Sequence, residues 1–356
     1  MEDILVVNKF YVKSNLFKYQ VKSINNVKKT IDSINGNKFL LVDNKVMNLF
    51  KSLNKINLNS NNIVRIRANE KNKEFSAITK IISKLLKKGI KKNSILIVIG
   101  GGITQDIGGF ISSILFRGIQ WFFFPTTLLA QGDSCIGSKT SINFKYSKNQ
   151  IGTFYPPSKI FLNEGFLLTL KKNDLLSGLG EMSHYFIIGG KKAFELFEKE
   201  MSKKLIDYEM LIFKCLRIKR KFIEKDEFDK NQRNILNYGH TFGHAIETVT
   251  NYKIPHGVAV SIGIDLVNHF SVQMGYMNAK LKKRINNTLK KIYRGYKFNN
   301  LNIKKIIEAI KKDKKSIEKS INLILSKNLE RMFIKKIVIN KKFEMILNCY
   351  FENLNV

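Results

Sequence analysis

Two histidines stand four residues apart in the stretch LNYGHTFGHAIE, residues 236 to 247, and a third opens the apolar run HGVAVSIG at residue 256. Residues four apart lie one turn apart on the same face of a helix, so His240 and His244 should point the same way. Two imidazoles and one carboxylate, with an open coordination position, make a catalytic zinc site. The candidate carboxylate is Glu181, an acid inside the otherwise apolar segment SGLGEMSHYF.

The same histidines allow a plainer interpretation. Three of the five histidines of the chain fall within seventeen residues, which favours a shared purpose. The residues between the first two are Thr, Phe and Gly, so the HExxH pattern of zinc proteases is absent. Histidines that are simply satisfied within packed helices remain the alternative to a metal site.

A glycine-rich turn, IVIGGGITQD at residues 97 to 106, follows a continuous apolar run. Backbone amides in such a turn can approach a phosphate, and the start of the next helix favours negative charge. The glycine spacing matches neither GxGxxG nor GxxxxGK, so the turn alone does not identify a nucleotide site. A purely structural turn, with Asp106 as a carboxylate at a helix start, is the alternative.

Charged and polar side chains gather in FRGIQWFFFPTTLLAQGDSCIGSKTSINF, residues 116 to 144, and in KNQIGTFYPP from residue 148. Charges next to so much apolar sequence need partners if they are buried. Surface loops on an α/β core are the plain alternative. The residues in question are Arg117, Asp133, Ser134, Lys139, Lys148 and Asn149.

The elements that must position these residues follow from hydrophobic periodicity. Residues 38 to 48 suit a strand that leads into a turn, and residues 95 to 102 form an apolar, β-branched run stopped by glycines. Residues 62 to 67 alternate, and residues 76 to 91 carry apolar side chains at helical spacing. Strand, helix, strand, glycines and a further helix indicate a parallel α/β domain. From about residue 165 the pattern becomes mostly helical. We therefore expect an α/β domain over residues 1 to 168 and a mostly α-helical domain over residues 169 to 356.

Composition excludes several classes of protein. The net charge of +34 is spread over the whole chain, and no zinc finger, RNP box or basic helix is visible, so we expect no nucleic-acid partner. Three scattered cysteines make no disulfide framework. The N-terminus is no signal peptide, and no apolar run is long enough to span a membrane. We expect a soluble cytoplasmic protein.

Taken in order, these segments resemble the successive motifs of the 3-dehydroquinate synthases and the related sugar phosphate cyclases, from roughly residue 40 to residue 330. The motifs are GGGITQD, FRGIQWFFFPTTLLAQGDSCIGSKTSIN, KNQIGTFYPP, SGLGEMSHY, NYGHTFGHAIE, HGVAVSIG and DKK. The resemblance implies a Rossmann-like NAD-binding α/β domain followed by an α-helical domain that binds metal and substrate. It also implies a catalytic zinc or cobalt ion, NAD⁺ and a homodimer. The implied reaction is the phosphate-eliminating cyclisation of 3-deoxy-arabino-heptulosonate 7-phosphate to 3-dehydroquinate, in the shikimate pathway of aromatic amino acid biosynthesis.

The resemblance assigns roles to individual residues. The implied metal ligands are Glu181, His240 and His256. The positions that match NAD-holding residues are Asp43, Glu70, Lys73, Gly101, Gly102, Ile103, Thr104, Gln105, Asp106, Thr126, Thr127, Lys139, Lys148, Phe166, Leu167, Leu168 and Thr169. The positions that match substrate-facing residues are Arg117, Asp133, Lys139, Asn149, Lys219, Arg233, Asn237, His244 and Lys314.

Several positions depart from the family pattern. The family's GGKT appears as Gly137-Ser138-Lys139-Thr140, and an acidic position before the histidine helix appears as Asp229. His184 stands where the family usually has a lysine, and Val258 stands where it usually has a glutamate. Lys219 and Arg233, the cations expected to meet a substrate carboxylate, are retained and favour 3-dehydroquinate synthesis. A divergent cyclase for another heptulose phosphate is the alternative. A metal-dependent polyol dehydrogenase and a basic, non-catalytic binding protein are further alternatives.

Overall fold

The computed structural model describes residues 8–145, 147–296, 302–313 and 320–354. The chain forms two compact units, which are described separately. The first comprises Met1–Leu170 and Arg220–Phe228, and the second comprises Lys171–Lys219 and Asp229–Val356. The domain boundary expected after residue 168 stays a prediction. The expected second domain contained the segment Arg220–Phe228, whereas this segment belongs to the first compact unit.

The first unit is built on a seven-stranded sheet with the order β1-β2-β9-β6-β5-β3-β4. Its strands are β1 (Lys9–Val12), β2 (Tyr19–Ser23), β3 (Lys38–Asp43), β4 (Ile63–Ile66), β5 (Ile95–Gly100), β6 (Gln120–Pro125) and β9 (Lys159–Leu162). All neighbours pair in parallel except β1 and β2. Every residue of β5 is buried, as expected for a parallel strand covered on both faces. The strands predicted from residues 38, 62 and 95 onward are confirmed, but Asn44–Leu49 form a helix where a turn was expected, and β1, β2, β6 and β9 were not predicted.

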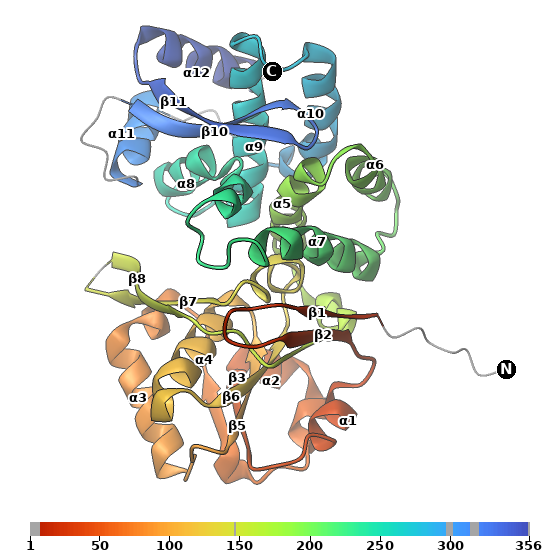
Figure 1. Cartoon of the computed structure of the whole chain (residues 1–356), viewed down its shortest axis with the longest axis vertical. Helices are drawn as coiled ribbons and strands as arrows, with labels where there is room; N and C mark the ends of the chain where they lie inside the picture. Colours follow the sequence, from red (N-terminus) through yellow and green to blue (C-terminus); the bar gives the residue numbers. More distant parts are fainter. Residues whose placement is uncertain (1–7, 146, 297–301, 314–319, 355–356) are drawn as a thin grey trace, which may run out of the picture. The chain divides into compact units, whose positions relative to one another are not determined.

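Helices cover both faces of this sheet, as Figure 1 shows with α1 on one side and α3 and α4 on the other. The helices are α1 (Val27–Asp32), α2 (Asn44–Leu49), α3 (Phe75–Lys87) and α4 (Gly102–Ile114). Alternate residues along each strand face opposite sides. Leu40, Ile97 and Phe122 belong to the core shared with α1 and α2. Val98 and Trp121, by contrast, lie against glycines of α4. The α/β fold class is therefore confirmed.

The second unit is mostly helical, with a two-stranded hairpin that the periodicity did not predict. Its helices are α5 (Lys172–Ile188), α6 (Lys191–Glu200), α7 (Tyr208–Ile223, of which the last residues belong to the first unit), α8 (His240–Val249), α9 (His256–Gln273), α10 (Ala279–Tyr293), α11 (Ile303–Asp313) and α12 (Lys341–Leu354). The hairpin joins β10 (Ser320–Asn328) to β11 (Arg331–Val338). Figure 1 shows α9 between α8 and α10. Every residue from Gly257 to Asn268 is buried, so α9 is the central helix of this unit.

A buried polar cluster ties α9 to its neighbours. Asp265 on α9 accepts hydrogen bonds from Asn286 at 2.5 Å, from Tyr293 at 3.1 Å and from Tyr350 at 2.9 Å. Lys282 Nζ lies 3.4 Å from the other carboxylate oxygen. A buried charge that is hydrogen-bonded and paired in this way fixes the arrangement of the helices that supply its partners. Within the described residues, no helix has both the length and the apolar character required to cross a membrane.

Candidate functional site

Glu181, His240 and His256 meet in the second unit, each from a different helix. Glu181 lies in α5, and the two histidines are the first residues of α8 and α9. His240 Nε2 lies 3.4 Å from Glu181 Oε1, and His256 Nε2 lies 3.3 Å from Glu181 Oε2. Ligand atoms bound about 2.1 Å from a tetrahedral zinc ion are roughly 3.4 Å apart. All three ligand atoms lie within 4.8 Å of one another, so the three residues fit a metal ion.

Glycines bring these three helices close enough together. A Cβ atom on Gly257 would lie 1.8 Å from the Ser177 carbonyl oxygen, and one on Gly180 would lie 2.1 Å from the Gly257 oxygen. The backbones of α5 and α9 therefore touch just beside Glu181 and His256. Gly263 plays the same part toward α8, because its Cβ would lie 2.1 Å from the Gly239 oxygen. Only glycine allows approaches this close.

The electrostatics of the cluster favour an ionised carboxylate. Burial alone would raise the pKa of Glu181, which is 4% exposed, but His240 and His256 outweigh burial and hold that pKa well below its usual value. Burial would lower the pKa of His256, but Glu181 and Glu247 outweigh it and hold that pKa well above its usual value. Glu181 and His256 therefore favour opposite charges, which attract each other.

His256 has a second carboxylate on its other side. Its Nδ1 lies 2.8 Å from Oε2 of Glu247, which belongs to the last turn of α8. The ligand atoms of His244, Glu247 and His256 form a second group that lies close together. Glu247 was not predicted as a site residue, although it lies seven residues after His240 and so on the same helix face.

The other predicted residues of the second unit lie in several places. His244 and His184 both lie near His240, with ring centroids 5.5 Å from its ring. His184 is fully buried. Lys219 Nζ lies 5.9 Å from the ring centroid of Tyr185, the residue that follows His184. The 3-10 turn Gln232–Asn237 before α8 contains the buried Arg233 and the exposed Asn237. Val258 is buried in α9. Lys314 lies outside the described residues.

In the first unit, the residues predicted to hold a cofactor follow the carboxyl ends of parallel strands. Asp43 ends β3, Glu70 and Lys73 form a 3-10 turn after β4, and Gly101, Gly102, Ile103, Thr104, Gln105 and Asp106 follow β5. Thr126 and Thr127 follow β6, and Phe166, Leu167, Leu168 and Thr169 lie in the 3-10 turn after β9. Carboxyl ends of parallel strands meet at one edge of a sheet, where open α/β sheets bind ligands.

Some of these residues contact one another. Lys73 Nζ lies 2.6 Å from Asp106 Oδ2 and donates a hydrogen bond of 2.7 Å to Asn149 Oδ1. Glu70 accepts a hydrogen bond from Asn143 at 2.8 Å. Burial raises the pKa of Asp106, although the Lys73 ammonium opposes this. Helix α4, the 3-10 turn after β4 and the hairpin of β7 (Lys139–Phe144) and β8 (Ser147–Phe154) are thus tied together.

The turn before Lys139 has an unexpected partner. Ser138 adopts φ +67°, a conformation that glycine prefers, and its hydroxyl donates a 2.5 Å hydrogen bond to the buried Glu227. Glu227 also accepts hydrogen bonds of 2.6 Å from the Ser14 hydroxyl and the Asn15 amide. Glu227 belongs to the return segment Arg220–Phe228, so no local pattern pointed to it. Lys139 itself is exposed.

Three further predicted residues lie elsewhere in the first unit. Asp133 belongs to the π-helical turn Ala130–Ser134, and Lys148 is exposed on β8. Arg117 is exposed in the 3-10 turn Leu115–Arg117, which comes before β6 rather than after it. The fold therefore places Arg117 at the amino ends of the strands, apart from the cofactor residues of the same unit.

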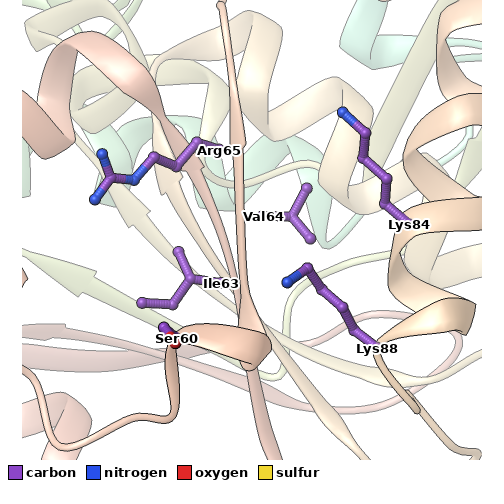
Figure 2. A pocket seen from close by; sticks show the side chains of 6 residues that line it. All are labelled: Ser60, Ile63, Val64, Arg65, Lys84 and Lys88. Atoms are coloured by element: carbon purple, nitrogen blue, oxygen red, sulfur yellow. The ribbon is translucent and has the colours of Figure 1, made fainter.

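A cavity of about 390 Å³ lies at the edge strand β4, beside α3, and none of the predicted residues lines it. Its lining residues are Ser60, Ile63, Val64, Arg65, Lys84 and Lys88. Figure 2 shows Val64 pointing toward the two lysines, whereas Ile63 and Arg65 point to the other side of the strand. The three cations do not converge on one point, so the cavity is no ready-made phosphate site.

The sequence matches one family over most of its length. Residues 63–177 match the family model described as 3-dehydroquinate synthase N-terminal, and residues 178–316 match the one described as 3-dehydroquinate synthase C-terminal. The 3-dehydroquinate synthase of Pelagibacter ubique (strain HTCC1062) is 38% identical over 343 residues, which cover 90% of this chain and 92% of the relative.

Solved structures share the fold. A 2-deoxy-scyllo-inosose synthase complexed with carbaglucose-6-phosphate, NAD⁺ and Co²⁺ superposes with a TM-score of 0.85 at 20% identity, covering 97% of this chain and 100% of that one. A 2-epi-5-epi-valiolone synthase from Streptomyces hygroscopicus subsp. jinggangensis 5008, with NAD⁺ and Zn²⁺ bound, gives 0.82 at 20% identity, covering 94% and 97%. The resemblance drawn from the motifs is confirmed: the chain belongs to the 3-dehydroquinate synthase family of phosphate-eliminating lyases.

Proposed function

We propose that this protein converts 3-deoxy-arabino-heptulosonate 7-phosphate into 3-dehydroquinate and phosphate, with NAD⁺ and a divalent metal ion as cofactors. The observation that carries the proposal is the cluster of Glu181, His240 and His256 in a chain of this family. Zinc is the first candidate for the metal and cobalt the second, since relatives of the same fold bind one or the other. We propose that the protein acts as a homodimer in the cytoplasm.

The two cofactors would supply chemistry that side chains lack: the metal ion acts as a Lewis acid on substrate hydroxyls, and NAD⁺ accepts and returns a hydride. Glu181, His240 and His256 hold the metal ion. Asp43 is an acid at the carboxyl end of a parallel strand, the kind of residue that binds ribose hydroxyls. The amides of the turn at Gly101 and Gly102 lie at the start of α4, which favours the pyrophosphate of NAD⁺.

The substrate is a keto acid phosphate, so its binding site must neutralise a carboxylate and a phosphate. Lys219 and Arg233 are buried cations, each 5% exposed, at positions that the family resemblance matches to residues facing a substrate carboxylate. We assign them to the substrate carboxylate and His244 to the neighbourhood of the phosphate. Asp133, Lys139, Asn149, Asn237 and Lys314 complete the proposed substrate-facing set. Arg117, which the family resemblance also assigned to it, is left out because it lies at the amino ends of the strands.

The substrate assignment has a specific competitor. His184 replaces a lysine of the family pattern and lies buried next to His240, so the proposed substrate site has one permanent cation fewer. A heptulose phosphate that carries no carboxylate would suit such a site better. A cyclase for that class of substrate is therefore the second candidate function.

The test is phosphate release by the purified protein with zinc and catalytic amounts of NAD⁺, with the keto acid phosphate compared with sedoheptulose 7-phosphate. We expect phosphate from the keto acid phosphate only, one 3-dehydroquinate for each phosphate, and no accumulation of NADH. Release from sedoheptulose 7-phosphate alone would support the second candidate. Accumulation of NADH without phosphate release would instead identify a polyol dehydrogenase.

A further inference from the structure

The two nitrogens of His256 face two different carboxylates. Nε2 lies 3.3 Å from Glu181 and Nδ1 lies 2.8 Å from Glu247. A neutral imidazole carries one proton, so one nitrogen donates a hydrogen bond while the other can bind a metal. Which nitrogen carries the proton is set by the partner of the other nitrogen.

The backbone fixes Glu247 beside His256. Tyr252 N donates a 2.8 Å hydrogen bond to the Glu247 carbonyl oxygen, and this closes the turn that follows α8. Asn251 and Tyr252 both take positive φ angles, of 51° and 58°, which reverse the chain within a few residues. Pro255 then caps α9, with His256 as its first residue. The Glu247 side chain is only 13% exposed, so its carboxylate is held in place rather than free in solvent.

We propose that Glu247 is a positioning residue for the metal centre: its carboxylate accepts the Nδ1 proton of His256 and so presents the unprotonated Nε2 to the metal ion. The inference rests on the metal site of the proposed function and adds a residue to which the family resemblance gave no role. Metal-binding histidines commonly donate their second ring N–H to a carboxylate, and loss of that partner typically weakens metal binding by about 10- to 100-fold.

A second metal ion is the competing explanation for the same geometry. His244, Glu247 and His256 could form a site of their own. His256 would then have to lose both ring protons in order to bind one metal with each nitrogen. The 2.8 Å separation from Glu247 is instead an ordinary hydrogen-bond distance.

The test measures zinc binding by the metal-free full-length protein, titrated against a chromophoric chelator. Glu247→Gln has nearly the same shape but lacks the charge, and we expect its zinc affinity to fall about 10- to 100-fold. Glu247→Asp keeps the charge and should restore part of the loss. Glu195→Gln is the matched control, because Glu195 is a half-exposed carboxylate of the same unit that pairs only weakly, at 3.8 Å, with Arg284.

Two further readouts separate positioning from a general structural role. The far-UV circular dichroism of the metal-free variants should equal that of the parent protein. The visible absorption bands of the Co²⁺-loaded protein should shift in Glu247→Gln and not in Glu195→Gln, because only the former removes the carboxylate that holds the ligand His256 in place.

The outcomes distinguish this inference from the proposed function. If the parent protein binds one zinc ion per chain and Glu247→Gln binds it equally tightly, the role of Glu247 is refuted while the metal site stands. Two zinc ions in the parent protein, one of them lost in Glu247→Gln, would refute it in favour of a second metal site. A parent protein that binds no zinc would overturn both the inference and the metal site of the proposed function.

Discussion

Replacing Gly257 with alanine should damage stability and metal binding together. The new Cβ would lie 1.8 Å from the Ser177 carbonyl oxygen, whereas real Cβ atoms stay at least 3.0 Å from such neighbours. The Ser177 oxygen is a backbone atom and cannot rotate aside as a side chain could. Helices α5 and α9 must therefore separate by about 1.2 Å, the difference between these two distances. Overpacking of this kind costs about 1–3 kcal/mol, and we expect the upper end. A loss of ~3 kcal/mol lowers the unfolding midpoint by roughly 6–12 °C in a domain of this size.

The same separation moves Glu181 away from His256. Metal sites tolerate deviations of about 0.2 Å in ligand distance, so a shift several times larger should weaken zinc binding strongly. Differential scanning calorimetry of the metal-free protein and a chelator titration would measure the two effects. Gly295→Ala is the control, because a Cβ there meets no atom within 4 Å. An unchanged midpoint and unchanged zinc affinity in Gly257→Ala would refute the reasoning about helix contact.

Three further predictions concern charge, strain and metal. Burial would raise the pKa of Glu200, but a 2.5 Å hydrogen bond from Lys203 and a hydrogen bond from a backbone amide lower this pKa below its usual value. Glu200→Gln should therefore lower the free energy of unfolding by about 1 kcal/mol near neutral pH. Urea titrations should show that this loss fades as the pH falls from the unfolded pKa of about 4.3 through the lower folded pKa. Ser138→Gly should relieve the positive φ of this residue but remove one hydrogen-bond donor from the buried Glu227. Thermal unfolding should show a net loss of about 1 kcal/mol in the free energy of unfolding. A gain in stability would mean that backbone strain outweighs the hydrogen bond. A chelator should lower the unfolding midpoint of the parent protein, since zinc at 100 times its Kd contributes about 2.7 kcal/mol, and it should leave Glu181→Gln unaffected.

Much of the fold could be predicted from local patterns. The buried run at β5 and the glycines that follow it indicate a parallel strand and a turn, because such a strand must be apolar on both faces. The spacing of His240 and His244 placed them on one helix face, and α8 confirms it. These signals are short-range, so a single sequence suffices to read them.

The missed features depend on contacts between distant segments. Glu227 reaches Ser138 only because the chain returns to the first unit after α7, and no periodicity records that return. Gly180 and Gly257 look like ordinary helix-weakening residues until their helices are seen to touch. The hairpin of β10 and β11 was missed because its strands follow a long helical region rich in lysine.

The most direct test of the central claim is the zinc content of the purified protein, measured together with phosphate release from 3-deoxy-arabino-heptulosonate 7-phosphate, in the parent protein and in His240→Ala. The account predicts one zinc ion per chain and NAD⁺-dependent release in the parent protein, with both lost in the variant. If His240→Ala keeps its zinc and its turnover, then Glu181, His240 and His256 are not the metal centre of this enzyme.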